Sequence, residues 1–326
     1  MRLTAAEKAE IIHLVDHADR PAREVLDELG IPRSSFYDWY RSYLAKGPDG
    51  LNPARPGRRQ RWNQIPASQR RIVVDLALEF TDQSCRELAC KITDETGISI
   101  SESSVYRILK SEGLITTPQH VLMEAADKFT EQTTHVHEMW QTDFTYFKVE
   151  GWGWYYLQTI LDDYSRYIIH WELCGSMEHE DVQKLVDEAI MITGLEETQE
   201  KPRILSDNGP CYIANDLKKF LHKRQIRHVR GRPMHPQTQG KIERYHRSIK
   251  NVVKLNKYYC PEELTDAIRT YVNFYNYFRY HESLDNVTPA DVYFGRKETV
   301  LERRKKAKRQ TMQQRRLMYQ NSKLAS

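Results

Sequence analysis

The chain has few cysteines and no long apolar segment, and both absences narrow the class of protein. Its 326 residues include five cysteines, none of which forms a Cys-x-x-Cys pair or a Cys/His zinc pattern. No run approaches the roughly 18 apolar residues that a membrane-spanning helix needs. The first residues also lack the long apolar core of a secretory signal. We therefore expect a cytoplasmic protein with reduced thiols, no structural zinc and no membrane partner.

The chain also lacks an even distribution of charge, although its formal net charge is only +4. Residues 55–71 hold six arginines and no acid, and residues 223–250 hold nine Lys and Arg against one acid. Residues 296–326 hold eleven bases against two acids, whereas residues 131–200 hold fifteen acids and three bases. A single charge run is usually a solvated surface. Three basic blocks beside one acidic region favour a polyanionic partner such as nucleic acid.

Residues 1–50 show the spacing of three short helices. Apolar residues recur at helical intervals, and Gly30 suits the turn between the second helix and the third. Helix, glycine-containing turn and helix is the helix-turn-helix pattern, with a small helical bundle without a DNA role as the alternative. The third helix would present to a DNA groove the side chains of Arg33, Ser34, Ser35, Tyr37 and Arg41.

A linker rich in Gly, Pro and Arg is predicted over residues 51–65, because the segment has no apolar period. Arg58, Arg59 and Arg61 would contact DNA phosphates there, and a linker with no DNA role is the alternative.

Residues 66–118 repeat the helical pattern and predict a second, winged-type helix-turn-helix domain. A capping box is expected at Ser99-x-x-Glu102, just before the last helix. That helix would present to DNA the side chains of Ser103, Ser104 and Arg107. Two DNA-reading modules in tandem indicate recognition of a longer specific site.

Strands dominate after a second linker at residues 119–138. Three strands separated by two turns are predicted first, and helices then alternate with strands. This order predicts an α/β core of the ribonuclease H type with a mixed five-stranded sheet over residues 139–295. A basic tail is expected at residues 296–326. The fold class is therefore multidomain, with all-α helix-turn-helix modules followed by the α/β core.

Three acidic residues stand in contexts that suit metal ligation. Asp143 interrupts an aromatic strand in WQTDFTYF, Asp207 follows an apolar stretch in ILSDNGP, and Glu243 opens a helix in QGKIERYH. Carboxylates delivered by two strands and a helix are what a pair of divalent metal ions needs for phosphodiester chemistry. Three solvated surface acids are the alternative. For Asp162 and Asp163 we favour a role in a turn between strands over metal ligation.

Five motifs in one order carry a family resemblance. They are W-x-x-D at residues 140–143, DDYSR at 162–166, SDNG at 206–209, HPQTQGKIERYHRSIK at 235–250 and FYNYFRYHESLDNVTPADVYFG at 274–295. Together they resemble the integrase core of bacterial insertion-sequence transposases, the branch closest to retroviral integrases. The 35 residues between the second and third acids are the spacing of that family. The His/His/Cys/Cys zinc module of retroviral integrases has no match, and helix-turn-helix modules take its place, as in the bacterial members.

The resemblance implies a DDE-type DNA transposase that binds the terminal inverted repeats of its mobile element, cleaves their ends and joins them to target DNA. Asp143, Asp207 and Glu243 would hold two Mg²⁺ ions, with Mn²⁺ as a substitute. The partner would be double-stranded DNA, and joining two ends requires a homodimer or a larger homo-oligomer. In the bacterial cytoplasm the protein would associate with the nucleoid when bound. The alternative is a catalytically silent or domesticated DNA-binding protein.

Two further groups of residues lie near these acids. On a helix, Glu243 shares one face with His246, Arg247 and Lys250, which would form a basic stripe that holds the scissile strand. An ordinary Glu–Arg surface pair is the alternative. The aromatic residues of the predicted hairpin, Trp152, Trp154, Tyr155 and Tyr156, could stack on unpaired bases. Strand alternation would place half of them in the core, so we favour packing.

Overall fold

The computed structural model describes residues 3–52, 61–81, 83–115, 133–230 and 240–324. The chain divides into two compact units, Met1–Gln64 and Ile65–Ser326. Among the described residues, none of the helices combines the length and the apolar character that crossing a membrane requires.

The first unit is the predicted three-helix module. It consists of α1 (Ala5–Asp16), α2 (Ala22–Glu28), α3 (Arg33–Lys46) and the 3-10 turn η1 (Gly47–Leu51). Gly30 adopts a left-handed φ of 65° between α2 and α3, as expected for this turn. Its core is built from one apolar face of each helix, namely Ile12, Val15, Val25, Leu26, Phe36 and Leu51. The predicted helix-turn-helix arrangement is confirmed.

A second three-helix module opens the second unit. It consists of α4 (Ala67–Glu79), α5 (Cys85–Thr96) and α6 (Glu102–Ser111), which bury Val105, Ile108 and Leu109 among other apolar residues. The described residues of this module contain no strand, and residues 116–118, where a wing would continue, lie outside them.

The capping box expected at Ser99 is wrong. The N-cap of α6 is Ser101, which makes no side-chain cap. The backbone N–H of Ser99 instead donates to Thr311 Oγ1 at 2.9 Å. A reciprocal capping box exists at Ser84 and Glu87, where it starts α5. The distant partner of Ser99 was invisible to a local pattern.

The catalytic-type core is built on a mixed five-stranded sheet. Its strands are β1 (Met139–Val149), β2 (Gly153–Asp162), β3 (Ile168–Cys174), β4 (Arg203–Ser206) and β5 (His228–Arg230). Their order is β3-β2-β1-β4-β5, with β1, β2 and β3 antiparallel and with β4 and β5 parallel to β1. This is the ribonuclease H-like arrangement that the sequence predicted.

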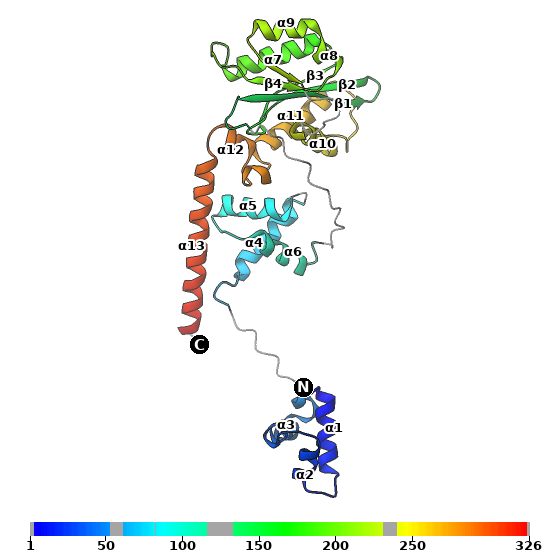
Figure 1. The fold of residues 1–326 in the computed structure, drawn as a ribbon, viewed down its shortest axis with the longest axis vertical. Coiled ribbons are helices and arrows are strands. Elements are labelled where there is room, and N and C mark those ends of the chain that lie inside the picture. The colour runs from blue at the N-terminus through cyan, green and yellow to red at the C-terminus, as the bar shows by residue number, and fades with distance from the viewer. Residues whose placement is uncertain (1–2, 53–60, 82, 116–132, 231–239, 325–326) are drawn as a thin grey trace. The chain divides into compact units, whose positions relative to one another are not determined.

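Helices cover both faces of the sheet (Figure 1). On one face lie α7 (His179–Thr193), α8 (Pro210–Ile213) and α9 (Asn215–Lys223), and on the other lie α10 (Gly240–Val253) and α11 (Pro261–Tyr277). Strand alternation supplies both cores, since Ile160 packs with α7 while its neighbour Leu161 packs with α10 and α11. The single turn η3 (Glu282–Leu284) and α12 (Pro289–Tyr293) follow.

The segment expected as a basic tail is a helix of 28 residues, α13 (Lys297–Leu324). It buries Val300, Ala307, Thr311 and Arg315, whose spacings of 7, 4 and 4 residues place them on one helical face. Its high content of Lys and Arg concealed this face from the sequence analysis.

Two arginines of α13 bind the second helical module. Arg304 donates to both carboxylate oxygens of Asp94 on α5, at 2.8 and 2.6 Å, and Tyr280 donates to the same carboxylate at 2.9 Å. Arg315 donates to Gln69 Oε1 at 2.8 Å. Burial raises the pKa of Asp94, but the hydrogen bonds and charge of Arg304 outweigh it and hold that pKa below its ordinary value.

Replacing Arg304 should therefore destabilise the second unit. Arg304→Ala leaves the Asp94 carboxylate largely buried without its main partner, which costs about 3 kcal/mol of unfolding free energy. Arg303→Ala is the matched control, because Arg303 lies 3.4 Å from the same carboxylate but its side chain is 61% exposed. That change should cost under about 1 kcal/mol. Urea unfolding checks both values, and equal losses would contradict the assignment.

Candidate active site

The sheet brings two of the three predicted acids side by side. β1 and β4 are parallel neighbours with Gln141 opposite Leu205, so two further steps along each chain set Asp143 beside Asp207. The turn after β4 holds Asp207 in place, because Gly209 N–H donates to Asp207 Oδ1 at 2.8 Å. A side chain at position 209 would approach that oxygen to 3.0 Å, so glycine suits this position.

The third acid comes from the helix that packs on β1. Burial raises the pKa of Glu243, and the charge of Asp143 raises it further. Burial also raises the pKa of Asp207, with the Gly209 hydrogen bond acting against it and the charge of Asp143 adding to it. Both carboxyl groups are therefore electrostatically coupled to Asp143. The three acids share one region of negative potential.

Asp143 lies against His246. His246 Nδ1 is 3.3 Å from Asp143 Oδ2, and Asp143 Oδ1 accepts a hydrogen bond from Phe144 N–H at 2.8 Å. His246 is only 6% exposed, which differs from the exposed basic stripe expected for it. The reason is helix geometry, since His246 follows Tyr245 on the buried side of α10. Arg247 is exposed, as expected for a residue that contacts DNA.

Further basic residues continue along α10 from the acids. Lys250 is half-buried, and its ammonium lies 4.5 Å from the centre of the Tyr146 ring. Lys254 reaches the same ring at 5.4 Å. Burial lowers the pKa of Lys250, and the neighbouring charge of Lys254 lowers it further. This face of α10 therefore carries concentrated positive charge directly beside the acids.

Across the described residues, no group of three or more His, Cys, Asp or Glu side chains is arranged to hold a metal ion. Asp143 faces His246, and Asp207 turns back onto Gly209 N–H. The donor chemistry nevertheless suits a hard divalent cation, because all three predicted ligands are carboxylates. Burial is the main cause of the raised pKa values of Asp207 and Glu243, and the charge of Asp143 adds to both.

A buried polar network fixes the start of α10. Asp163 Oδ1 accepts from Gln141 Nε2 at 2.7 Å, and Gln141 Oε1 accepts from Ile242 N–H at 3.0 Å. Lys241 forms an ion pair with the Asp163 carboxylate and donates to the Asp163 carbonyl at 2.9 Å. Gln141 lies two residues before Asp143, and Ile242 lies one residue before Glu243. The network therefore sets the position of Glu243 relative to Asp143.

The neighbouring Asp162 is wholly structural. It accepts hydrogen bonds from Ser165 N–H at 2.8 Å, from Ser165 Oγ at 2.6 Å and from His137 N–H at 2.8 Å. The Asp162 carboxylate thus binds within the β2–β3 turn, as predicted, whereas Asp163 lies in the turn but directs its carboxylate to Gln141 and Lys241. The additional role of Asp163 in holding α10 was missed, because Lys241 lies 78 residues away in sequence.

The residues predicted to read DNA lie mainly on the surface of the two helical modules. Those that are exposed are Arg33, Ser34, Tyr37, Arg41, Arg61, Ser103 and Arg107. Ser35 and Ser104 are half-buried, and Arg58 and Arg59 lie outside the described residues. Arg33 is 3.5 Å from Asp27, and Arg41 is 3.7 Å from Asp38. Their contact with DNA stays a prediction.

Removing the Asp163 carboxylate should loosen this part of the core. Asp163→Ala leaves the Lys241 ammonium without its carboxylate partner and Gln141 Nε2 without an acceptor, so we expect a loss of about 3 kcal/mol in unfolding free energy. Glu150→Ala is the control, because Glu150 also pairs with a lysine but its side chain is 45% exposed. Urea unfolding followed by circular dichroism measures both. A loss below 1 kcal/mol for Asp163→Ala would refute the structural role.

Neutralising Glu243 should increase the free energy of unfolding at pH 7. The pKa of Glu243 is higher in the folded protein than in the unfolded chain. The folded protein therefore loses stability relative to the unfolded chain as the pH rises from the unfolded pKa through the folded pKa. Glu243→Gln removes that cost, and because the group is largely exposed the gain at pH 7 should stay under about 1 kcal/mol. Below about pH 4 the two proteins should converge. Unfolding at both pH values tests this, with the exposed Glu262→Gln expected to have no effect; a loss of stability at pH 7 would contradict it.

The chain matches family models along most of its described length. Models described as "Integrase core domain" match residues 133–236 and 224–289. Models described as "Homeodomain-like domain" match residues 2–52 and 35–109. The second pair covers both helical modules, and the first pair covers the sheet with the helices that carry the acids.

Retroviral proteins are among the relatives. The Gag-Pro-Pol polyprotein of mouse mammary tumor virus (strain BR6) is 30% identical over 163 residues, which are 48% of this chain and 8% of that polyprotein. That of squirrel monkey retrovirus is 30% identical over 115 residues, 35% of this chain and 6% of the polyprotein. The chain thus spans less than a tenth of these relatives.

Solved structures are similar at lower identity. The HTLV-2 integrase catalytic core domain in complex with magnesium is 21% identical with a TM-score of 0.39, covering 49% of this chain and 97% of that one. The simian T-cell lymphotropic virus intasome in complex with PP2A regulatory subunit B56 gamma is 18% identical with a TM-score of 0.42, covering 68% and 74%. From its sheet topology and its family matches, this chain carries an integrase core domain preceded by homeodomain-like domains of the helix-turn-helix type.

Proposed function

We propose that the protein is a DNA transposase of the integrase type. It would bind the terminal inverted repeats of a mobile element, cleave the element ends and join them to target DNA. The observation that carries this proposal is the placement of three acids, because the β1–β4 register sets Asp143 beside Asp207 and Glu243 lies in the first turn of α10, which packs on β1. The homeodomain-like modules support recognition of a specific DNA sequence.

The three carboxylates would hold two divalent cations, with Mg²⁺ as the natural ion and Mn²⁺ as a substitute. When bound, a metal pair supplies an activated oxygen nucleophile and relieves the charge that develops on the leaving oxygen. The fit rests on the oxygen-only donor set and on the raised pKa values of Asp207 and Glu243, since a cation would neutralise the shared negative charge.

Other residues would hold the DNA and keep the acids in position. Arg247 is exposed one turn from Glu243, and Lys250 lies one turn further, so both would contact phosphates of the strand being cleaved. His246 would orient Asp143 from the buried side of α10. The contacts of Gln141 and Asp163 would keep α10 at a fixed distance from β1. No covalent intermediate on the protein is required.

The DNA-reading surface would come from the two helical modules. Exposed residues of α3, among them Arg33, Tyr37 and Arg41, would enter a groove, and Ser103 and Arg107 of α6 would do the same. The partner would be double-stranded DNA, as element ends and as target. Because two ends must be joined in one reaction, the active form would be a homodimer or a larger homo-oligomer.

Asp207→Asn should separate binding from chemistry. The variant keeps an oxygen that can accept from Gly209 N–H but loses the charge for metal binding. Metal stabilisation is worth several kcal/mol, so Mg²⁺-dependent end cleavage should fall roughly 100- to 1000-fold or more. Affinity for the same duplex should stay within about twofold, because Asp207 lies outside the helical modules.

The substrate is a labelled duplex made from the inverted repeats that flank the coding DNA, with cleavage read on gels and binding by anisotropy. Asp216→Asn is the control, since this carboxylate lies on the surface of α9 in an ion pair with Lys219. If Asp207→Asn cleaved the element ends at the rate of the wild-type protein, the catalytic assignment would be refuted. End binding by the wild-type protein without any cleavage in Mg²⁺ or Mn²⁺ would favour a silent DNA-binding protein.

A further inference from the structure

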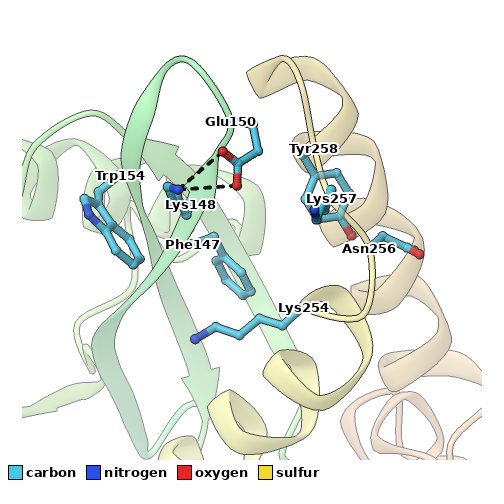
Figure 2. A pocket seen from close by; sticks show the side chains of 8 residues that line it. All are labelled: Phe147, Lys148, Glu150, Trp154, Lys254, Asn256, Lys257 and Tyr258. Atoms are coloured by element: carbon cyan, nitrogen blue, oxygen red, sulfur yellow. Dashed lines mark hydrogen bonds and ion pairs between the residues drawn. The ribbon is translucent and has the colours of Figure 1, made fainter.

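A cavity of about 250 Å³ lies where α10 ends beside the β1–β2 hairpin (Figure 2). It is lined by Phe147, Lys148, Glu150, Trp154, Lys254, Asn256, Lys257 and Tyr258. Phe147 is 2% exposed and Tyr258 is 7% exposed, so they form an apolar floor, whereas Trp154 is 53% exposed. An exposed tryptophan beside an apolar hollow is a surface on which a flat ring can stack.

Alternation was expected to place only half of the four aromatic residues at 152 and 154–156 in the core, and Trp154 belongs to the exposed half. Trp152 is 63% exposed as well. Only Tyr155 of this group packs against the main hydrophobic cluster, on the face of β2 opposite Trp154. Alternation therefore packed Tyr155 against the core, where it is half-buried, and left Trp154 in solvent.

The cavity continues the path that begins at the acids. Residues 243, 247, 250 and 254 follow the i, i+4, i+7, i+11 spacing of one helical face, so Lys254 lies about 16 Å along α10 from Glu243. Trp154 pairs with Lys148 across the hairpin, five residues along β1 from Asp143, which is about 17 Å. Both elements that carry the acids thus lead to the same cavity.

Side-chain contacts connect Lys250 of α10 to the cavity. Lys250 and Lys254 both lie over the ring of Tyr146, and the Tyr146 ring meets the Trp154 ring edge-on at a centroid distance of 5.4 Å. Tyr146 is itself 49% exposed. Figure 2 shows Lys254 reaching from the end of α10 across the opening toward Trp154. Positive charge and exposed aromatic rings therefore alternate along this surface.

The lining of the cavity has net positive charge. Lys148 is balanced by Glu150, whose two carboxylate oxygens it reaches at 3.3 Å, as Figure 2 also shows. The remaining charged lining residues are Lys254 and Lys257, both exposed. Two lysines beside an exposed indole offer a phosphate site and a stacking site within one hollow.

We propose that this cavity binds one unpaired nucleotide of DNA, with its base on Trp154 and its phosphate between Lys254 and Lys257. The volume is below the roughly 300–1,000 Å³ of drug-sized ligand sites, which suits a single base rather than a longer segment. A paired base is already stacked within its duplex, so only an unpaired base can use the indole face.

The identity of the strand rests on the function proposed above. If Asp143 and Glu243 hold the cleaved phosphate, the cavity takes a nucleotide about five positions away, at 3.4 Å of rise per nucleotide of B-form strand. The protein would then hold one opened position of the element end during cleavage. The protein would therefore bind more tightly to element ends in which the nucleotide about five positions from the cleaved phosphate is unpaired.

The test compares single-stranded and duplex DNA without metal. Anisotropy with the full-length protein in EDTA measures affinity for a labelled oligothymidine and for a duplex of equal length. Trp154→Ala should weaken single-strand binding roughly 5- to 150-fold, the range for loss of one base–aromatic stack, and should leave duplex binding unchanged. Trp154→Phe should keep most of the affinity. Trp152→Ala is the matched control, an exposed tryptophan two residues away that does not line the cavity.

Salt dependence separates the phosphate site from the stacking site. Lys254→Gln and Lys257→Gln should each reduce the slope of log affinity against log salt by about 0.7 for single-stranded DNA. Trp154→Ala should leave that slope unchanged, because it removes no charge. Lys218→Gln on α9 is the control for an exposed lysine on the other side of the sheet and should not change the slope.

Three results would overturn the proposal. The first is a Trp154→Ala variant that binds single-stranded DNA as tightly as the wild type. The second is a Trp152→Ala variant that loses as much single-strand affinity as Trp154→Ala. The third is a Trp154→Ala variant that loses as much affinity for duplex as for single-stranded DNA. None of these measurements involves metal or cleavage, so failure of the cavity leaves the acid assignment untouched. Wild-type cleavage by Asp207→Asn would in turn refute the catalytic proposal while leaving nucleotide binding in the cavity to stand.

Discussion

The geometry of the candidate active site depends on one buried network of polar side chains that joins β1, the β2–β3 turn and the first turn of α10. Gln141 binds Asp163 with one amide atom and Ile242 N–H with the other, and Lys241 completes the set. In a low-dielectric interior such a network is stable only when each member finds its partner, which restricts α10 to one position on the sheet. Because Ile242 precedes Glu243, a change of register in this contact would move the third acid away from the first.

Acidic and basic side chains lie close together along α10. Burial and the charge of Asp143 raise the pKa of Asp207 and of Glu243, while Arg247 acts on Glu243 in the opposite direction. The fold therefore places three acids together and sets basic side chains of α10 beside them. Such preorganisation costs stability in the free protein and is repaid when ligands bind, which is common at functional sites.

The basic C-terminal segment shows how one residue type serves two purposes. Its Lys and Arg content suggested only phosphate binding, yet Arg304 and Arg315 point into the second unit and bind Asp94 and Gln69. An arginine can do this because its planar group donates in several directions and satisfies a partly buried carboxylate. The remaining lysines of α13, among them Lys305 and Lys308, stay on the surface.

The sequence by itself predicted the strands, their order and most of the helices, though not α13, because hydrophobic period and turn residues are local properties. It did not determine that His246 is buried against Asp143, that Ser99 binds Thr311 or that Trp154 faces solvent. Each of these depends on which distant element lies against a given face: β1 brings Asp143 against His246, α13 reaches Ser99, and no described element covers Trp154. Local periodicity predicts which faces of a helix or strand are apolar, but only tertiary packing decides which faces are buried. Packing also brings the Asp163 carboxylate, which lies in a turn, against Lys241 at the start of α10.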